Sequence, residues 1–359
     1  AQYIVDNPDG INMKEYVDMG FLLNLEPYLA DSKLADPDFA WDDFLGPVDQ
    51  FVIFEGARYG IPLRAAPMFL FYRSDLFEQY ADEFENQFGY ELVPPRTWSE
   101  YLDVAKFFNE IEWKAPDGGR GYGTAEHGMK EFSMFYMFRQ RFSGIAKEEL
   151  GIPLNLLDDQ YNPTFDNELG VKAVRNWIES LNYAPPGALQ CGNAETKQLF
   201  AQGKVAMTVQ FGSLYTLLGD SPVAGKFAMA VVPGGSPEAG VPPVAVNSTS
   251  RNPRAAFLFA QWLTSKEIDL SKFLDGGIEP ARKTSLAADA YQKVNPFYGV
   301  VIDSLEQAMS LPVLPEFAQL ETATADELHP ALTRQISPEE AIENLRSRFV
   351  DILTEGGYY

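Results

Sequence analysis

Cysteine and histidine are scarce in this chain of 359 residues, which contains one cysteine and two histidines. The single Cys191 excludes an internal disulfide and cannot build a cysteine-based zinc site by itself. His127 precedes glycine and His329 precedes proline, so neither fits the H-E-x-x-H helix of zinc proteases. We therefore expect no metal site built from His and Cys, and we predict no cofactor. The low cysteine content suits a cytosolic or a periplasmic protein equally well.

Sequence signatures of enzymes are also missing. The chain has no G-x-S-x-G elbow, and the G-K pairs at 203–204 and 225–226 lack the Ser or Thr of a phosphate-binding loop. The glycines at 119–123 lack the dinucleotide spacing and predict a turn that enters a strand. Adjacent aspartates at 42–43 and 158–159 could act as glycosidase acids, but adjacent pairs arise by chance among 51 acidic residues and are usually solvated.

Basic residues are few, since 28 of them face 51 acidic residues and give a formal charge of −23. Such a field repels phosphate backbones and anionic lipids, so binding to nucleic acid or to a membrane surface is disfavoured. The ordinary role of this charge is solubility. The uncharged stretch at 205–219 is too polar to span a bilayer, and no signal peptide is visible at Ala1.

The length and composition indicate a globular protein of two domains, with 46% hydrophobic and 13% aromatic residues. Short apolar runs alternate with capped amphipathic helices, a pattern typical of α/β lobes. Residues 59–62, Y-G-I-P, cannot continue a helix, and Met68–Tyr72 forms an apolar run that predicts a buried strand. Thr97 and Glu100 form a capping box before an amphipathic helix. Its apolar face consists of Tyr101, Val104, Ala105, Phe108 and Ile111.

Later segments repeat this alternation. Strands are predicted at 205–209 and 227–232, and helices begin after the caps Asn167, Asn252 and Ser337. The helix after Asn252 should bury Ala256, Phe259, Ala260 and Leu263. The helix after Ser337 should bury Ile342, Leu345, Phe349 and Ile352.

In this order the segments resemble the extracellular (periplasmic) solute-binding proteins of ABC transporters, especially the family 1 sugar-binding type. The resemblance rests on G-I-P, Y-x-x-D-L-F, P-P-x-T-W-x-E, L-F-A-Q-G-K-V-A-M-T, V-V-P-G-G and G-G-I-E-P-A-R-K, and it covers almost the whole chain. It implies an α/β fold of the two-lobed periplasmic-binding-protein type (class II), with hinge crossovers between the lobes.

The resemblance also implies how the lobes divide the chain. The first lobe should comprise 1–62 and 247–310, and the second 63–246 and 311–359. Crossovers are expected near Ile61–Phe69, Pro242–Asn247 and Leu311–Phe317. Because βα units precede the position of Ala1 in the family, the first lobe is expected to be truncated at its N-terminal end.

A cleft that closes on a neutral, hydroxyl-rich ligand needs planar hydrogen-bonding side chains and stacked aromatic rings. Arg64 lies in the first crossover and could bind hydroxyls or a carboxylate, or equally form an ion pair between the lobes. Glu126 and His127 follow a predicted strand. They either face the cleft, as the resemblance implies, or lie in an exposed loop.

The loop after the strand at 205–209 offers the next candidates. Gln210 is a hydroxyl partner, and Gly212 belongs to the loop in which the family places a stacking aromatic ring. Leu214 stands at the usual tryptophan position, so stacking passes to Phe211 or Tyr215, or is lost. Core packing is an equal alternative for Phe211.

Three further candidates follow from the resemblance. Asn247 ends the return crossover. In the G-G-I-E-P-A-R loop, the Gly277 backbone can approach a ligand closely, and Arg282 is expected to point toward the cleft.

The predicted function is capture of a sugar or sugar-like polyol by a periplasmic or extracellular binding protein, which closes by hinge motion and delivers the ligand to ABC permease subunits. We expect a monomer that acts without catalysis and binds no nucleic acid. One alternative is a carbohydrate-active enzyme, a glycosidase or lyase using paired carboxylates. Another is a receptor or chemosensory protein with the same fold.

Overall fold

The computed structural model describes residues 4–6, 13–45, 51–240, 242–309 and 313–359, which fall into two compact units. Unit 1 comprises Ala1–Pro67 and Ala239–Ala318, and unit 2 comprises Met68–Glu238 and Gln319–Tyr359. The chain therefore passes between the units three times. The opening residues 1–3, and residues 311–312 of the third expected crossover, lie outside the described residues.

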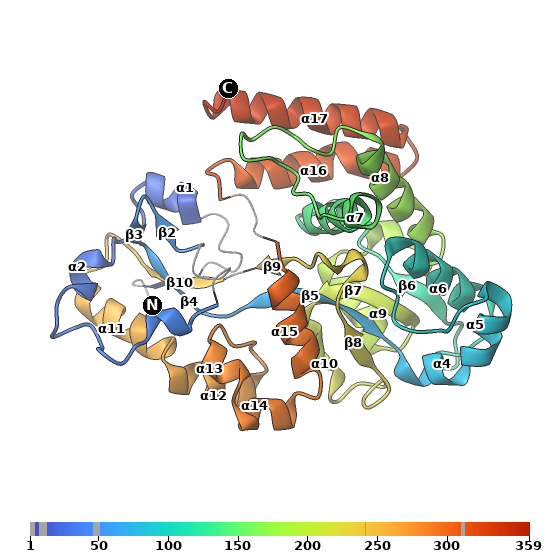
Figure 1. Cartoon of the computed structure of the whole chain (residues 1–359), viewed down its shortest axis with the longest axis horizontal. Coiled ribbons are helices and arrows are strands. Elements are labelled where there is room, and N and C mark those ends of the chain that lie inside the picture. Colours follow the sequence, from blue (N-terminus) through green and yellow to red (C-terminus); the bar gives the residue numbers. More distant parts are fainter. Residues whose placement is uncertain (1–3, 7–12, 46–50, 241, 310–312) are drawn as a thin grey trace. The chain divides into compact units, whose positions relative to one another are not determined.

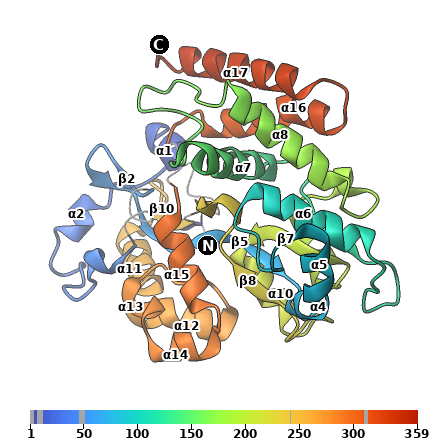
Figure 2. The same cartoon turned by 45° about the vertical axis from the view of Figure 1, so that its right-hand side comes forward.

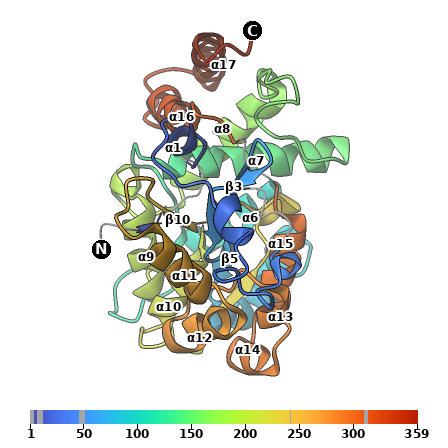
Figure 3. The same cartoon turned by 90° about the vertical axis from the view of Figure 1, so that its left-hand side faces the viewer.

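Unit 1 contains a small antiparallel sheet with the strand order β1-β10-β4, in which Val244 pairs with Ile61. Helices α11 to α14 gather into one group (Figures 1 and 3). The strands are β1 (Ile4–Asp6), β2 (Ile53–Phe54), β3 (Ala57–Arg58), β4 (Gly60–Pro62), β9 (Ala239–Gly240) and β10 (Pro243–Val246). The helices are α1 (Met13–Asp18), α2 (Glu26–Leu29), η1 (Trp41–Asp43), α11 (Pro253–Leu263), α12 (Lys266–Gly276), α13 (Lys283–Leu286), α14 (Asp289–Val294) and α15 (Tyr298–Gln307).

Unit 2 is built on a sheet with the order β6-β7-β5-β8, in which only β6 and β7 run parallel. The strands are β5 (Ala66–Tyr72), β6 (Tyr122–Ala125), β7 (Val205–Phe211) and β8 (Ala228–Ala230). The helices are α4 (Ser74–Gln79), α5 (Ala81–Phe88), α6 (Trp98–Glu110), α7 (Ser133–Leu150), α8 (Glu168–Leu181), η2 (Ala188–Gln190), α9 (Asn193–Ala201), η3 (Gly212–Leu214), α10 (Tyr215–Leu218), η4 (Pro233–Gly235), α16 (Phe317–Leu332) and α17 (Pro338–Glu355). Helix α17 packs against α8 (Figures 1 and 2).

The capping signals at Thr97, Asn167 and Ser337 form as predicted, but the Asn252 side chain makes no capping hydrogen bond at the start of α11. The Thr97 hydroxyl accepts a hydrogen bond from the Glu100 amide (3.1 Å), and the Glu100 carboxylate accepts one from the Thr97 amide (3.3 Å). Asn167 caps α8, and Ser337 caps α17. The strands predicted at Met68–Tyr72 and 205–209 are confirmed as parts of β5 and β7.

The expected orientation of α11 is wrong for Phe259, whose side chain is 46% exposed. The buried stripe instead runs through Ala256, Phe257, Ala260 and Gln261. Phe257 packs on the ring of Tyr28, and the Gln261 amide donates to the Leu34 carbonyl (3.1 Å). These partners lie more than two hundred residues earlier in the sequence and set the rotation of the helix, so apolar spacing within the helix could not decide it.

A close approach of two glycines joins α7 to η4 in unit 2. A Cβ atom on Gly234 would lie 2.3 Å from the Gly144 Cα, and Gly234 has the positive φ of 80° that favours glycine. The P-G-G segment therefore packs against a long buried helix at van der Waals distance. Within the described residues, no helix has both the length and the apolar character needed to cross a membrane.

Candidate functional site

Two strand ends of unit 2 meet at one edge of its sheet. Strands β6 and β7 are parallel, with Ala125 paired to Thr208, so their carboxyl ends lie side by side. The antiparallel strand β5 begins at the same edge, because Met68 pairs with Phe211. The Met68 amide also donates to the Glu238 carbonyl (2.8 Å). Two of the passages of the chain between units thus leave unit 2 beside this edge, which we call the β6/β7 edge.

Glu126, the first residue after β6, is buried and fully engaged within unit 2. Its carboxylate accepts hydrogen bonds from Arg141 Nη2 (2.6 Å) and from the Tyr101 hydroxyl (2.8 Å). The Arg141 guanidinium also lies over the rings of Trp98 (4.4 Å) and Trp177 (5.2 Å). Burial and the nearby Glu126 charge raise the pKa of Tyr101 well above its usual value. The Glu126–Arg141 ion pair is therefore buried inside unit 2, where it stabilises the end of β6.

His127 points away from this pair into a second polar cluster, as alternation along an extended chain requires. Its Nδ1 lies 3.0 Å from the Ser133 hydroxyl, and its Nε2 lies 3.3 Å from the Thr196 hydroxyl. Burial, reinforced by the positive charge of Arg141, lowers the pKa of His127 to about 3. The imidazole is therefore neutral at physiological pH and joins the starts of α7 and α9 to β6.

Gln210 continues this cluster to β7. Its Nε2 donates to the Thr196 hydroxyl (2.9 Å) and to the Asn193 carbonyl (3.2 Å), while its Oε1 accepts from the Phe211 amide (2.7 Å). Glu126, His127 and Gln210 are at most 2% exposed. The structure thus brings all three predicted residues together, but as buried members of two hydrogen-bond networks.

The accessible candidates at the edge are aromatic. The half-buried ring of Phe211 lies 5.8 Å from the ring of Tyr136 in an edge-to-face contact. Gly212 is buried at the start of η3. Tyr215 is half-buried, and its ring contacts that of Phe227 (6.0 Å). The edge therefore offers aromatic ring surface beside the buried polar networks, an arrangement suited to a ligand with C–H faces.

In unit 1, Arg282 is fully buried and held by its own unit. Its Nε donates to the Thr264 carbonyl (2.8 Å), and its Nη1 lies 3.4 Å from an Asp43 carboxylate oxygen. The guanidinium also sits over the rings of Phe39 (4.6 Å) and Phe44 (4.0 Å). These contacts fasten the loop after α12 to η1.

The other predicted residues of unit 1 lie near turns and chain passages. Arg64 is half-buried and follows Leu63, whose carbonyl accepts from Lys272 Nζ (2.6 Å). The half-buried Asn247 accepts the Thr249 amide through its side chain (2.8 Å) and so closes its own turn. Gly277 ends α12 with a φ of 66°, and its amide is bonded to the Phe273 carbonyl (2.8 Å).

The adjacent carboxylates are engaged locally. Asp43 accepts hydrogen bonds from the Thr284 amide (3.0 Å) and hydroxyl (2.7 Å), and Asp158 accepts the amides of Gln160 and Asn162 (2.8 Å each). Among the described residues no three His, Cys, Asp or Glu side chains gather as a metal site would require. Asp158 therefore holds a local turn through its side chain, and Asp43 holds the start of α13.

Sequence reasoning missed Tyr101, Arg141, Ser133 and Thr196 as members of the networks. One signal was present: Arg139-Gln140-Arg141 interrupts an otherwise apolar stretch of α7, and every residue from Ser133 to Ala146 is buried. Charged residues are rarely buried without a partner, so this run indicated acidic partners elsewhere in the fold. Arg139 is indeed paired with the buried Glu238, at the second passage between units.

Comparisons with known proteins identify the family to which the chain belongs. The family model described as "Bacterial extracellular solute-binding protein" matches residues 6–296. The chain belongs to this family, which confirms the resemblance seen in the sequence. The family consists of substrate-binding proteins of ABC transporters, so the chain is a binding protein and not an enzyme.

Individual relatives agree with this assignment. The chain is 25% identical over 347 residues to a mannitol-binding protein of Pseudomonas aeruginosa, covering 89% of this chain and 75% of the relative. A probable ABC transporter-binding protein of Deinococcus radiodurans is 25% identical over 323 residues, covering 85% and 72%.

Solved structures show the same two-lobed α/β fold, as predicted. Maltose-bound MalE3 of T. maritima aligns with a TM-score of 0.82 at 22% identity, over 97% of this chain and 84% of that one. A solute-binding protein of Agrobacterium vitis with bound D-mannitol aligns with a TM-score of 0.77 at 22% identity, over 99% and 85%.

Proposed function

We propose that the protein captures a sugar or sugar-like polyol between its two units and delivers it to the permease subunits of an ABC importer. The observation that carries this proposal is the half-buried Phe211 ring, which packs edge-to-face on Tyr136 at the end of β7, next to the hydrogen-bonded side chains of Gln210 and His127. Such a surface favours the C–H face of a neutral ligand over an ion. Relatives that bind mannitol, ribitol and maltose support the same ligand class.

Within this proposal, the candidate residues of unit 2 divide into two groups. Phe211, Gly212 and Tyr215 contact the ligand, while the buried networks of Glu126, His127 and Gln210 hold the strand ends in place. The Gln210 side chain is directly bonded to the Phe211 amide (2.7 Å), so it fixes the backbone that presents the ring.

In unit 1 we propose Arg64, Asn247 and the Gly277 backbone as ligand neighbours. Arg282 supports the loop from behind, because its Nε and Nη1 donate to the Thr264 and Ala40 carbonyls (2.8 and 3.0 Å). The hinge would use the chain passages near Pro67, Glu238 and Ala318. A monomer acting in the periplasm or outside the cell completes the proposal.

A ligand screen followed by one substitution tests this function. Mannitol, ribitol, tagatose and maltose would be added to the whole chain and the unfolding temperature recorded; a ligand at about 100 times its dissociation constant adds ~2.7 kcal/mol of stability. The best ligand would then be titrated calorimetrically into Phe211→Ala, for which we expect affinity to fall about tenfold, or ~1.4 kcal/mol, as a ring contact is lost.

The matched control is Phe88→Ala, which removes a half-buried ring that stacks on Phe84 in α5 of the same unit (4.7 Å). It should lower stability and leave affinity unchanged. If no sugar or polyol stabilises the protein while amino acids or peptides do, the ligand class is wrong. Equal affinities of the two variants would instead remove Phe211 from the site.

A further inference from the structure

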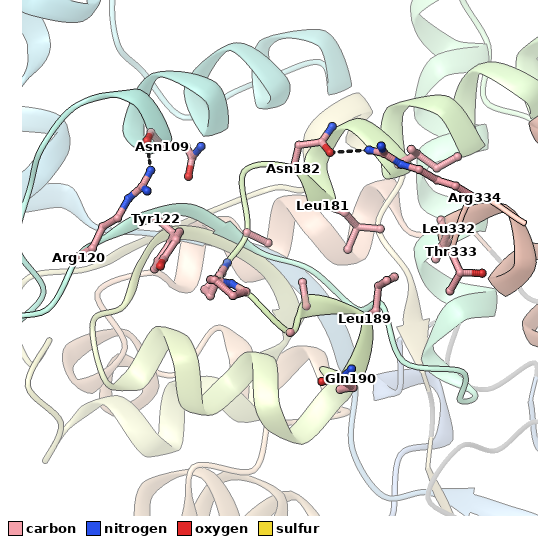
Figure 4. A pocket seen from close by; sticks show the side chains of 16 residues that line it. Asn109, Arg120, Tyr122, Leu181, Asn182, Leu189, Gln190, Leu332, Thr333 and Arg334 are labelled. Carbon is pink, nitrogen blue, oxygen red and sulfur yellow. Dashed lines mark hydrogen bonds between the residues drawn. The ribbon is translucent and has the colours of Figure 1, made fainter.

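A cavity lies in unit 2 at the opposite end of β6 from the β6/β7 edge. The cavity measures about 560 Å³, and Tyr122, the first residue of β6, forms part of its wall (Figure 4). Its other walls come from the end of α8, the P-P-G segment at 185–187, η2 and the turn after α16. This volume falls in the range of small-molecule sites.

The charge of this cavity is opposite to that of the molecule. The chain carries 51 acidic against 28 basic residues, yet none of the sixteen lining residues is acidic, and the charged ones are Arg120 and Arg334. Figure 4 places these two side chains on opposite sides of the cavity. Glu179 lines an adjoining hollow and accepts the Tyr183 hydroxyl there (3.1 Å).

Each guanidinium is oriented without an acidic partner. Arg120 Nη2 donates to the Asn109 carbonyl (2.8 Å), and its guanidinium lies over the Tyr122 ring (5.1 Å). Arg334 Nη2 donates to the Asn182 side chain (2.7 Å). Across the described residues, neither arginine has a carboxylate within salt-bridge distance. A guanidinium has five donors, so both retain donors that suit a carboxylate.

Arg334 also occupies a strained backbone position. Its φ is +62°, in the left-handed region that normally holds glycine after a helix, and its amide is bonded to the Ala331 carbonyl (2.9 Å).

Between the two arginines the cavity is lined by apolar side chains together with the polar Gln190 and Thr333. Leu181, Leu189 and Leu332 line it, and Pro185 and Pro186 contribute no backbone N–H. The wall is firmly held, since the Cys191 carbonyl just after η2 accepts the amides of Gly128 (2.9 Å) and Met129 (3.0 Å). The cavity therefore has one firmly held wall, with a cationic group on either side of leucine and proline side chains.

We propose that this cavity binds a linear dicarboxylate: one carboxylate pairs with Arg120, the other with Arg334, and the aliphatic chain covers the leucines and prolines. This site is separate from the β6/β7 edge and does not depend on the sugar-binding proposal. The chain length that binds best would report the spacing of the two guanidinium groups.

Calorimetric titration of the whole chain with adipate, suberate and sebacate tests this proposal, with octanoate and octane diamine as controls. We expect at least one diacid to bind at least about tenfold more tightly than octanoate, and the diamine not to bind. Failure of all three diacids to bind, or equal binding of octanoate and the best diacid, would overturn it.

Two variants assign the binding to the cavity. Arg120→Gln and Arg334→Gly should each weaken diacid binding about tenfold or more. Glycine suits a φ of +62°, so Arg334→Gly is expected to unfold at the same temperature as the wild type or higher. Arg254→Gln, which removes an exposed arginine of unit 1, is the control and should bind like the wild type. Retention of binding in Arg334→Gly would place the diacid elsewhere and refute the assignment.

Discussion

At the scale of single residues, buried arginines link elements of the fold by pairing with carboxylates and aromatic rings. Arg141 connects Glu126 with two tryptophan rings, and Arg282 connects Asp43 with two phenylalanine rings. Removing one partner of such a pair leaves an uncompensated charge in a poorly solvated place, which is strongly destabilising. Residue type alone therefore does not distinguish a ligand-binding arginine from a structural one.

Glu279 is a buried carboxyl group that makes the stability of the protein depend on pH. Burial raises its pKa from 4.5 to about 7, although the Tyr291 hydroxyl donates to it (2.7 Å). The native state therefore keeps a proton that the unfolded chain loses near pH 4.5, and this group lowers stability progressively as the pH rises from 4.5 to about 7. We expect Glu279→Gln to match the wild type at acidic pH and to exceed it above neutral pH by on the order of 2 kcal/mol.

Urea unfolding across this pH range measures the effect as the difference between variant and wild type. Glu306→Gln, at an exposed position of α15 in the same unit, is the control and should follow the wild type at every pH. A Glu279→Gln curve parallel to that of the wild type would contradict the raised pKa.

At the scale of elements, glycine contacts set how closely α7 and η4 approach. Gly234→Ala combines a φ of +80° with a Cβ atom 2.3 Å from the Gly144 Cα, so we expect a loss of at least ~3 kcal/mol. Gly225→Ala is the matched control, because φ is +69° but nothing lies within 4 Å of the added Cβ. It should cost only ~1–2 kcal/mol for the left-handed conformation. Denaturant unfolding compares the two, and equal losses would show that contact with α7 contributes little.

Elements also show how far local sequence signals reach. The capping box at Thr97 and the caps Asn167 and Ser337 form as predicted, because each involves groups within a few residues of one another. The rotation of α11 was not predicted correctly, because Tyr28 and Leu34 select the buried face.

At the scale of the whole molecule, the excess of acidic residues acts on stability. A formal charge of −23 repels itself in the compact state, and salt screens that repulsion. Exposed ion pairs such as Arg175 with Glu339 contribute little to stability, so screening them with salt costs little. The Arg141–Glu126 pair is buried, so salt screens it little. We therefore expect the unfolding temperature to rise between very low ionic strength and ~0.15 M NaCl. An equal osmolality of a neutral solute is the control, and a fall in the unfolding temperature with salt would show that attractive surface pairs dominate.

The sequence by itself determined the family, the two-lobed α/β fold and the order of its main elements. Those features rest on motifs and caps that act over short stretches, and on patterns of apolar residues that recur along the chain. Glu126, His127 and Gln210 were expected at the ends of two strands, where they lie, while their role as ligand-binding residues stays a prediction.

Only the tertiary structure decided what these side chains do. Glu126 is buried because Arg141 and Tyr101 surround it, and Arg282 because Thr264, Ala40 and Asp43 do. The cavity between Arg120 and Arg334 is likewise assembled from segments more than two hundred residues apart. Whether a polar group faces solvent or the interior depends on partners brought together by folding, and one chain's sequence does not state which distant residues will meet.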